Sequence, residues 1–448
     1  MDRILKIVYS KWLSVGNKKY PVANGTTDSF ASWAQNEVTA KNLKPTGEFD
    51  HFREFDDYFF FNTSDYERSY IYRNSNFYLH CKRNNIPFIF SGDVVNDGST
   101  YYYPVEIECD SWKYLIDNDR SYDFFETLDE QTLNLLRSGQ VQILLVNMVD
   151  PGLLKETAQE VYDHFVGQGI DKFTCLTGNH SYECDPNITN FDAILSLYQT
   201  ANEAERYPCD TALGYVSDFV REQDLTDRVR GKKFICFNRF MNRCHRAGMA
   251  HLALEHNLLD QGYFSFLYNF SNDYKDRLEQ LGLPTHRAEE INSLVPYQVD
   301  TENIGKDQLP TFFSVTNYKK ELYTDSYIHI VTETQFEQNA SPFMSEKTWR
   351  PILNLQPFIY VGNSFALNTL RKLGFRTFES FIDESYDVET DPVKRFSLIE
   401  QEIKKFASMD IQDIHTWYTS IKEDLIFNQH LLLSYKNYNP LCNLQNIN

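Results

Sequence analysis

Cysteine, glycine and proline are all scarce in this sequence. Of its 448 residues, 18 are Gly, 15 are Pro and 8 are Cys. The shortage of Gly and Pro argues against long flexible linkers. No two Cys form a CxxC pair, so neither a four-cysteine zinc site nor a disulfide scaffold is predicted, and no metal site is expected. Buried reduced thiols are the expected state, which favours a cytoplasmic location.

A long hydrophobic run is also missing. The longest apolar stretch, Ile143 to Val149, is far shorter than the roughly 18–20 residues of a membrane-spanning helix. The first residues include Lys6 and Lys11, and they lack the apolar segment and the small-residue cleavage site of a signal peptide. We therefore expect a soluble protein with no membrane span.

Positive charge is in deficit. The chain has 43 Lys and Arg against 63 Asp and Glu, which gives a formal net charge of −20. Nonspecific binding to a nucleic-acid backbone needs a basic surface, so nucleic acid is disfavoured as a partner. A local basic cleft stays compatible with this balance.

Several catalytic signatures are absent. The chain has no GxxxxGK[ST] phosphate loop, no HExxH zinc motif and no GxSxG nucleophile motif. Gly167-Gln168-Gly169 lacks the third Gly of a dinucleotide fingerprint. Pro208-Cys209 has no second Cys three residues later, which excludes the zinc-deaminase pattern.

What is present is a repeated alternation of apolar strands and helices. The clearest early unit is a strand over 142–149, a helix that starts at Pro151 and a strand over 173–177. Ligands of parallel sheets bind beyond the carboxyl ends of the strands. Four residues at or beyond such ends are candidate general bases: Asp93, Asp150, His180 and Glu183.

The second half shows the same alternation. Further strands are predicted over 232–237, 263–267, 327–331, 357–361 and 375–378. Helices are predicted over 191–204, 213–222, 247–259, 345–355, 363–373, 393–408 and 411–433. We predict an α/β fold of two domains, 1–230 and 231–448, with C-terminal helices.

Ser345-Glu346-Lys347 is the most informative motif. Ser345 fits a helix N-cap, and Glu346 and Lys347 fall in the first turn. A Glu there can accept hydrogen bonds from ribose hydroxyls, and a Lys can neutralise a diphosphate beside the free N–H groups of the helix. An ordinary capped helix with a solvated charge pair would show the same three residues.

Two more groups of polar residues follow predicted strands. Asn238 and Arg239 come after the strand at 232–237, with Arg243, His245 and Arg246 next along the chain. Arginine matches phosphate oxygens with two parallel hydrogen bonds, although surface pairing with acidic neighbours is equally common. Glu333 follows the strand at 327–331 and could orient a donor or simply cap a helix.

Together these motifs resemble the GT-B glycosyltransferases, most closely their fucosyltransferase-like group. The resemblance covers about residues 230 to 408, and it is most specific from Ser345-Glu346-Lys347 to the strand that ends at Gly362. It implies two Rossmann-like domains facing a cleft, with 1–230 on the acceptor side and 231–448 on the nucleotide-sugar side. By similarity, Glu346 would hold the ribose, and Lys347 with Arg239 the diphosphate of a GDP-sugar. Trp349-Arg350-Pro351 departs from the small apolar residues usual in that group.

The expected function is therefore a glycosyltransferase of hexosyl or fucosyl type. It would move a sugar from a nucleoside-diphosphate sugar to a hydroxyl acceptor, with a glycan favoured, by an inverting reaction without a metal or resident cofactor. Asn238, Arg239, Arg246, Glu333, Ser345, Glu346 and Lys347 form the predicted donor site. Transfer to modified DNA bases and a non-catalytic nucleotide- or glycan-binding protein remain alternatives.

Overall fold

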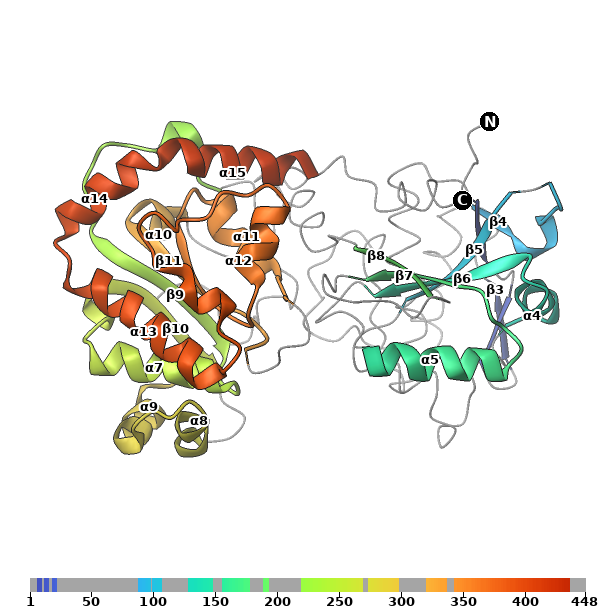
Figure 1. Cartoon of the computed structure of the whole chain (residues 1–448), viewed down its shortest axis with the longest axis horizontal. Helices are drawn as coiled ribbons and strands as arrows, with labels where there is room; N and C mark the ends of the chain where they lie inside the picture. The colour runs from blue at the N-terminus through green and yellow to red at the C-terminus, as the bar shows by residue number, and fades with distance from the viewer. Residues whose placement is uncertain are drawn as a thin grey trace. The chain divides into compact units, whose positions relative to one another are not determined.

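The computed structural model describes residues 6–9, 12–15, 18–21, 88–97, 99–106, 128–147, 155–177, 188–192, 219–268, 273–297, 320–336 and 342–435. The chain divides into two compact units. The first comprises residues 1–195 with 439–448, and the second comprises 196–438. Each unit contains its own parallel sheet, coloured blue to green in the first and green to orange in the second (Figure 1).

The first unit is built on a six-stranded sheet ordered β4-β1-β5-β6-β7-β8, parallel throughout. Its strands are β1 (Lys6–Tyr9), β4 (Phe88–Phe90), β5 (Tyr101–Glu106), β6 (Val141–Asn147), β7 (Phe173–Thr177) and β8 (Ile188–Asp192). An antiparallel pair, β2 (Trp12–Val15) and β3 (Lys18–Pro21), follows β1.

Apolar side chains fill the middle of this sheet and pack against a neighbouring helix. Ile143 and Leu144 of β6 are completely buried, as expected for a parallel strand with both faces covered. Helix α5 (Lys155–Gly167) buries Phe165, whose ring lies 5.0 Å from that of Phe173 in β7. Helix α4 (Glu130–Arg137) precedes β6.

The second unit is built on a parallel sheet ordered β10-β9-β11-β12. Its strands are β9 (Lys232–Phe240), β10 (Gly262–Tyr268), β11 (Ser326–Thr332) and β12 (Phe358–Val361). Every residue of β11 and β12 is buried. The sheet is therefore the centre of this unit's core, with helices against both faces.

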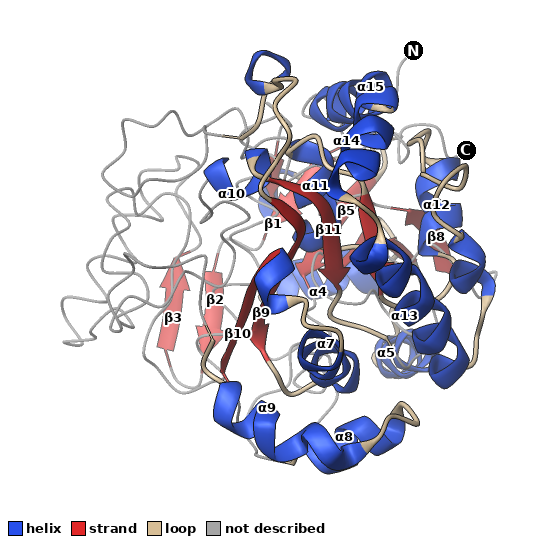
Figure 2. Cartoon of the chain, turned by 90° about the vertical axis from the view of Figure 1, so that its left-hand side faces the viewer, coloured by secondary structure: helices blue, strands red, loops and turns tan. Residues whose placement is uncertain are grey.

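The helices of the second unit are α7 (Cys244–Glu255), α8 (Tyr274–Gln280), α9 (Ala288–Leu294), α10 (Lys320–Thr324), α11 (Glu346–Leu353), α12 (Ala366–Lys372), α13 (Pro392–Ser408), α14 (Ile411–Ser420) and α15 (Lys422–Ser434). Helix α7 lies on one side of the sheet, and α11, α14 and α15 lie on the other (Figures 1 and 2). Asp391 and Asp410 cap α13 and α14 by accepting from backbone N–H groups of the first turn.

In both sheets the strand order reverses beside the strand that comes first in the chain. After β9 the chain forms β10 on one side, and then β11 and β12 on the other. The first sheet does the same around β1, with β4 on one side and β5 to β8 on the other. This is the doubly wound arrangement of Rossmann-like domains. The predicted α/β class with parallel sheets is confirmed, while a cleft between two facing domains stays a prediction.

Strand β9 is longer than predicted. It runs to Phe240, so Asn238 and Arg239 belong to the strand rather than to the loop after it. The Thr332 hydroxyl donates to Asn238 Oδ1 at 2.7 Å and holds β9 and β11 together near their ends. Helix α7 correspondingly begins at Cys244, before the predicted start at 247.

The predicted strand over 375–378 is wrong, because this segment has no strand partner in the structure. Its backbone donors bind side chains instead. Arg376 N–H donates to Asn428 Oδ1 at 2.8 Å, and Phe378 N–H donates to Glu384 Oε1 at 2.7 Å. Phe375 and Phe378 are buried, so the apolar pattern reports packing of a loop against the core.

Two predicted helices between the halves also differ from the structure. The expected helix over 191–204 begins where β8 is still a strand, paired through Phe191 and Asp192 with β7, and residues 193–218 lie outside the described part. The expected helix over 213–222 is extended at 219–221, and only the single turn Glu222–Asp224 follows. Residues 219–230 belong to the second unit, whereas the sequence assigned them to the first domain.

Candidate functional site

A buried carboxylate organises the loop that follows β11. Glu333 is fully buried. Its Oε1 accepts from Ser345 N–H at 3.0 Å and from the Thr348 hydroxyl at 2.5 Å. Its Oε2 accepts from the Ser345 hydroxyl at 2.7 Å and from Thr334 N–H at 3.2 Å. The three hydrogen bonds from Ser345 and Thr348 fix the first turn of α11 against the carboxyl end of β11.

Lys347 brings a cation to the start of α11. Ser345 is the N-cap, as predicted, and its Oγ accepts from Lys347 N–H at 3.3 Å. The half-buried Lys347 side chain turns back toward the helix start. Its Nζ lies 3.2 Å from Ser345 Oγ and 3.4 Å from Thr334 Oγ1. The dipole of the helix favours an anion at this end.

The start of α7 is fixed to the same loop. His245 Nε2 lies 2.7 Å from the Glu333 carbonyl oxygen, which can only accept, so Nε2 carries the hydrogen. Arg246 donates to the carbonyl oxygens of Glu333 and Phe240 at 3.1 and 2.9 Å. The His245 ring stacks on Phe336, with centroids 5.1 Å apart. Both βα junctions at the strand-order reversal are therefore connected through Glu333.

Arginine side chains gather around His245 at the start of α7. Burial lowers the pKa of His245 well below its usual value, and the charges of Arg246, Arg243 and Arg395 lower this pKa further. Arg246 and Arg395 are buried and donate to backbone carbonyls, whereas Arg243 is exposed at the N-cap of α7. Of these arginines, the exposed Arg243 is the one whose guanidinium is open to a phosphate group from solvent.

At the neighbouring junction between β12 and α12, a carboxylate of the protein already occupies the N–H groups at the start of the helix. The buried Asp387 carboxylate accepts from Leu367 N–H and Asn368 N–H, both at 2.9 Å. These are the donors that a bound phosphate would otherwise use. The comparison favours the junctions at β9 and β11 as the place for a phosphate.

The structure brings together most of the predicted donor-site residues. Glu333, Ser345, Lys347 and Arg246 are linked by hydrogen bonds. Asn238 is buried at the end of β9, where its side chain joins Thr332 and Cys236. Arg239 and Glu346 lie in β9 and at the first position of α11. Their side chains lie outside the described part, so the roles given to them stay predictions.

Of the four candidate general bases, the structure describes only Asp93. Asp150, His180 and Glu183 lie outside the described residues. Asp93 is exposed in the helical turn Ser91–Asp93 that directly follows β4. Its position at a strand end agrees with the prediction, and its role as a base stays a prediction.

Sequence reasoning missed Thr348 and Asp387. Thr348 is three residues after Ser345, so a helix places both side chains on the same side of its first turn, and this spacing was a usable signal. Asp387 reaches α12 from about twenty residues further along the chain, and no local pattern indicates that contact.

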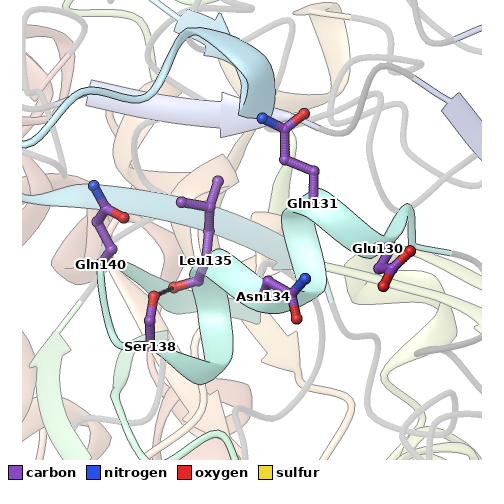
Figure 3. A pocket seen from close by; sticks show the side chains of 6 residues that line it. All are labelled: Glu130, Gln131, Asn134, Leu135, Ser138 and Gln140. Atoms are coloured by element: carbon purple, nitrogen blue, oxygen red, sulfur yellow. Dashed lines mark hydrogen bonds between the residues drawn. The ribbon is translucent and has the colours of Figure 1, made fainter.

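A pocket of about 550 Å³ lies over α4 in the first unit (Figure 3). Its lining residues are Glu130, Gln131, Asn134, Leu135, Ser138 and Gln140. The lining has amides, a hydroxyl and a carboxylate but no Lys or Arg, so it lacks the charge that a diphosphate needs. Within the described residues, no three His, Cys, Asp or Glu side chains come together as metal ligands. None of the described helices combines the length and the apolarity needed to cross a bilayer.

Comparison with known proteins does not identify a family for this chain. No protein-family model matches the chain, and no curated protein sequence matches it. Among solved structures, the crystal structure of a GtfA/B complex is similar to 75% of this chain, with 11% identity and a TM-score of 0.31. The chain spans 57% of the length of that protein chain. A TM-score this low does not define a shared fold, so the functional argument rests on the geometry of the site.

Proposed function

We propose that this protein is a glycosyltransferase that uses a nucleoside-diphosphate sugar, and that the donor's diphosphate binds at the strand-order reversal between β9 and β11. The observation that carries the proposal is the position of Lys347. Its ammonium lies at the N-terminus of α11, beside the end of β11, and Arg246 donates to the backbone of the same Glu333 that fixes this turn. The resemblance of Ser345-Glu346-Lys347 to the fucosyltransferase-like group supports the same assignment.

Sugar transfer from such a donor leaves a nucleoside diphosphate with growing negative charge. Groups that neutralise this charge stabilise the transition state. In our proposal Lys347 and the exposed Arg243 contact the diphosphate, with Arg239 as a further contact and Glu346 on the ribose. Glu333 and Arg246 act as positioning residues, because both are buried and fix the backbone that presents Lys347.

The acceptor hydroxyl attacks the anomeric carbon of the sugar, the bond to the diphosphate breaks, and a general base takes the hydroxyl proton. We propose that this base comes from the first unit, with Asp93, Asp150, His180 and Glu183 as candidates. A GDP-sugar donor, a glycan acceptor and an inverting, metal-independent reaction follow from the resemblance and belong to the proposal.

Titration of GDP and UDP by calorimetry tests the donor site. Lys347→Ala should weaken binding of the preferred nucleotide at least tenfold, because it removes a charge next to the diphosphate. Lys347→Arg should retain part of the affinity.

Lys372→Ala is the matched control, since Lys372 is exposed at the far end of a neighbouring helix. Equal affinity of the Lys347→Ala variant and the wild type would contradict the proposal. Nucleotide binding without release of nucleoside diphosphate from any sugar donor would instead favour a non-catalytic binding protein.

A further inference from the structure

Phe365 adopts a backbone conformation that an aromatic residue rarely takes. Its φ is 67°, in the left-handed region, where Gly and Asn are the usual residues. Leu355 is also left-handed, with a φ of 54°, but its side chain is completely buried, so packing offsets the strain. The Phe365 side chain is 38% exposed. Burial in the core therefore does not account for an aromatic ring at this position.

The conformation is imposed by Asp387. Phe365 N–H donates to the Asp387 carbonyl oxygen at 2.6 Å. The carboxylate of the same residue binds the N–H groups of Leu367 and Asn368. A strained residue that its surroundings hold from both sides is typical of functional sites. Here the arrangement holds a partly exposed aromatic residue four positions after the carboxyl end of β12.

The loop that carries Phe365 adjoins the proposed diphosphate site. Glu333 N–H donates to the carbonyl oxygen of Val361, the last residue of β12, at 3.0 Å. Asn363 Oδ1 accepts from Phe343 N–H at 3.0 Å, and Phe343 lies two residues before the N-cap of α11. Neighbouring strands of a sheet are only about 4.8 Å apart. A ligand held by Lys347 can therefore extend over the β12–α12 loop.

We propose that the Phe365 ring is the stacking surface for the nucleobase of the donor. This inference rests on the proposed function. Of the four parts of a nucleoside-diphosphate sugar, only the base is a flat π-system that stacks on an aromatic side chain. Val388, the residue after Asp387, is also exposed. Every base has a π-face, so the ring supplies affinity for the nucleoside while other contacts select the base.

The test compares ligands with and without a base. Phe365→Gly removes the ring and relieves the left-handed strain, so its melting temperature should equal or exceed that of the wild type. It should bind GDP or UDP about tenfold more weakly, a loss of about 1.4 kcal/mol, and bind inorganic pyrophosphate as the wild type does. Phe365→Tyr should keep full affinity. Phe427→Ala, which removes another exposed ring, is the matched control.

Lys347→Ala separates the two proposals, because it should weaken GDP, UDP and pyrophosphate alike. Unchanged nucleotide affinity in Phe365→Gly, with the Lys347→Ala effect intact, would overturn the stacking role alone. A loss confined to the complete nucleotide sugar would place the donor's sugar on the ring and also overturn it. If Lys347→Ala changes no affinity, the diphosphate site itself is wrong.

Discussion

At the scale of single residues, the buried ionisable groups of the second unit include hydrogen-bonded carboxylates and neutral histidines. The carboxylates of Glu333 and Asp387 accept several hydrogen bonds from nearby donors. The imidazoles of His245 and His329 are instead kept neutral, because burial lowers the pKa of each well below its usual value. The neutral form avoids the free-energy penalty of a buried charge.

The buried histidines predict that stability falls in mild acid. In the unfolded chain each histidine has a pKa near 6.5, so below about pH 6.5 the unfolded state binds protons that the folded state does not. The contribution is fully present above about pH 6.5. Below pH 6.5, each of these histidines lowers the free energy of unfolding by about 1.4 kcal/mol per pH unit. The loss ends when the pH reaches the pKa of that histidine in the folded state.

Urea unfolding at pH 7.5, 6.5 and 5.5 measures this slope. In His329→Gln the slope below pH 6.5 should be smaller by about 1.4 kcal/mol per pH unit. His329 contacts the rings of Phe237 and Tyr323, and the charge of Arg350 adds to the lowering of its pKa. His430→Gln, at an exposed position of α15, is the control and should leave the slope unchanged. An unchanged slope in His329→Gln would contradict the prediction.

At the scale of elements, the unit from β11 through α11 to β12 was predictable because its signals are local. Ser345 as N-cap, the Pro357 boundary and two short apolar runs placed all three elements within about two residues. The strand expected at 375–378 failed because its backbone donors bind side chains, those of Glu384 six residues further along the chain and of Asn428 about fifty residues further along. Local pattern identifies an element, and only tertiary contacts identify its hydrogen-bond partners.

In the candidate site, too, the sequence predicted the local features but not the tertiary contacts. Ser345 and Lys347 were found from their place at a helix start. The position of Glu333 after a strand was also found. Its four donors were not, because three of them belong to Ser345 and Thr348, which lie 12 and 15 residues further along the chain. The contact of Asp387 with α12 lay equally beyond a local pattern.

Glu333 should be the main link between β11 and α11. In Glu333→Gln, one amide oxygen can keep at most two of the four hydrogen bonds, and the amide N–H₂ faces two buried donors. Such unsatisfied groups cost about 1–3 kcal/mol each, so we expect a loss of about 3 kcal/mol in unfolding free energy and weaker nucleotide binding. Denaturant unfolding and calorimetry measure both.

Glu379→Gln is the matched control for this change, because the Glu379 side chain is 74% exposed. It should alter stability by less than about 0.5 kcal/mol. A Glu333→Gln protein as stable as the control would show that the carboxylate does not hold the two elements together.

At the scale of the whole molecule, the two units share one plan. Each has a parallel sheet whose first strand lies inside and whose order reverses beside it. The net charge of −20 belongs to the chain as a whole, whereas the charges of Arg243, Arg246 and Arg395 all act on His245 at the start of α7. An acidic protein can therefore attract phosphate at one place while the rest of its surface repels nucleic acid.

The start of the second unit can be tested with fragments. Buried Arg230 donates through its backbone N–H to the Tyr327 hydroxyl at 2.8 Å and through Nη1 to the Tyr323 carbonyl at 3.1 Å. Val220 is completely buried, and its carbonyl accepts from Gln429 Nε2 at 2.7 Å. A fragment that starts at residue 231 loses all of these contacts.

We therefore expect fragment 196–438 to unfold cooperatively and to bind the preferred nucleotide, with binding that depends on Lys347. Fragment 231–438 should be less stable by about 3 kcal/mol or more, because it loses buried apolar side chains worth about 1.5–3 kcal/mol each and leaves hydrogen-bond partners unsatisfied. Urea unfolding followed by circular dichroism compares the two. If both fragments unfold at the same urea concentration, residues 196–230 do not stabilise the second unit, and the domain boundary lies after residue 230, as the sequence predicted.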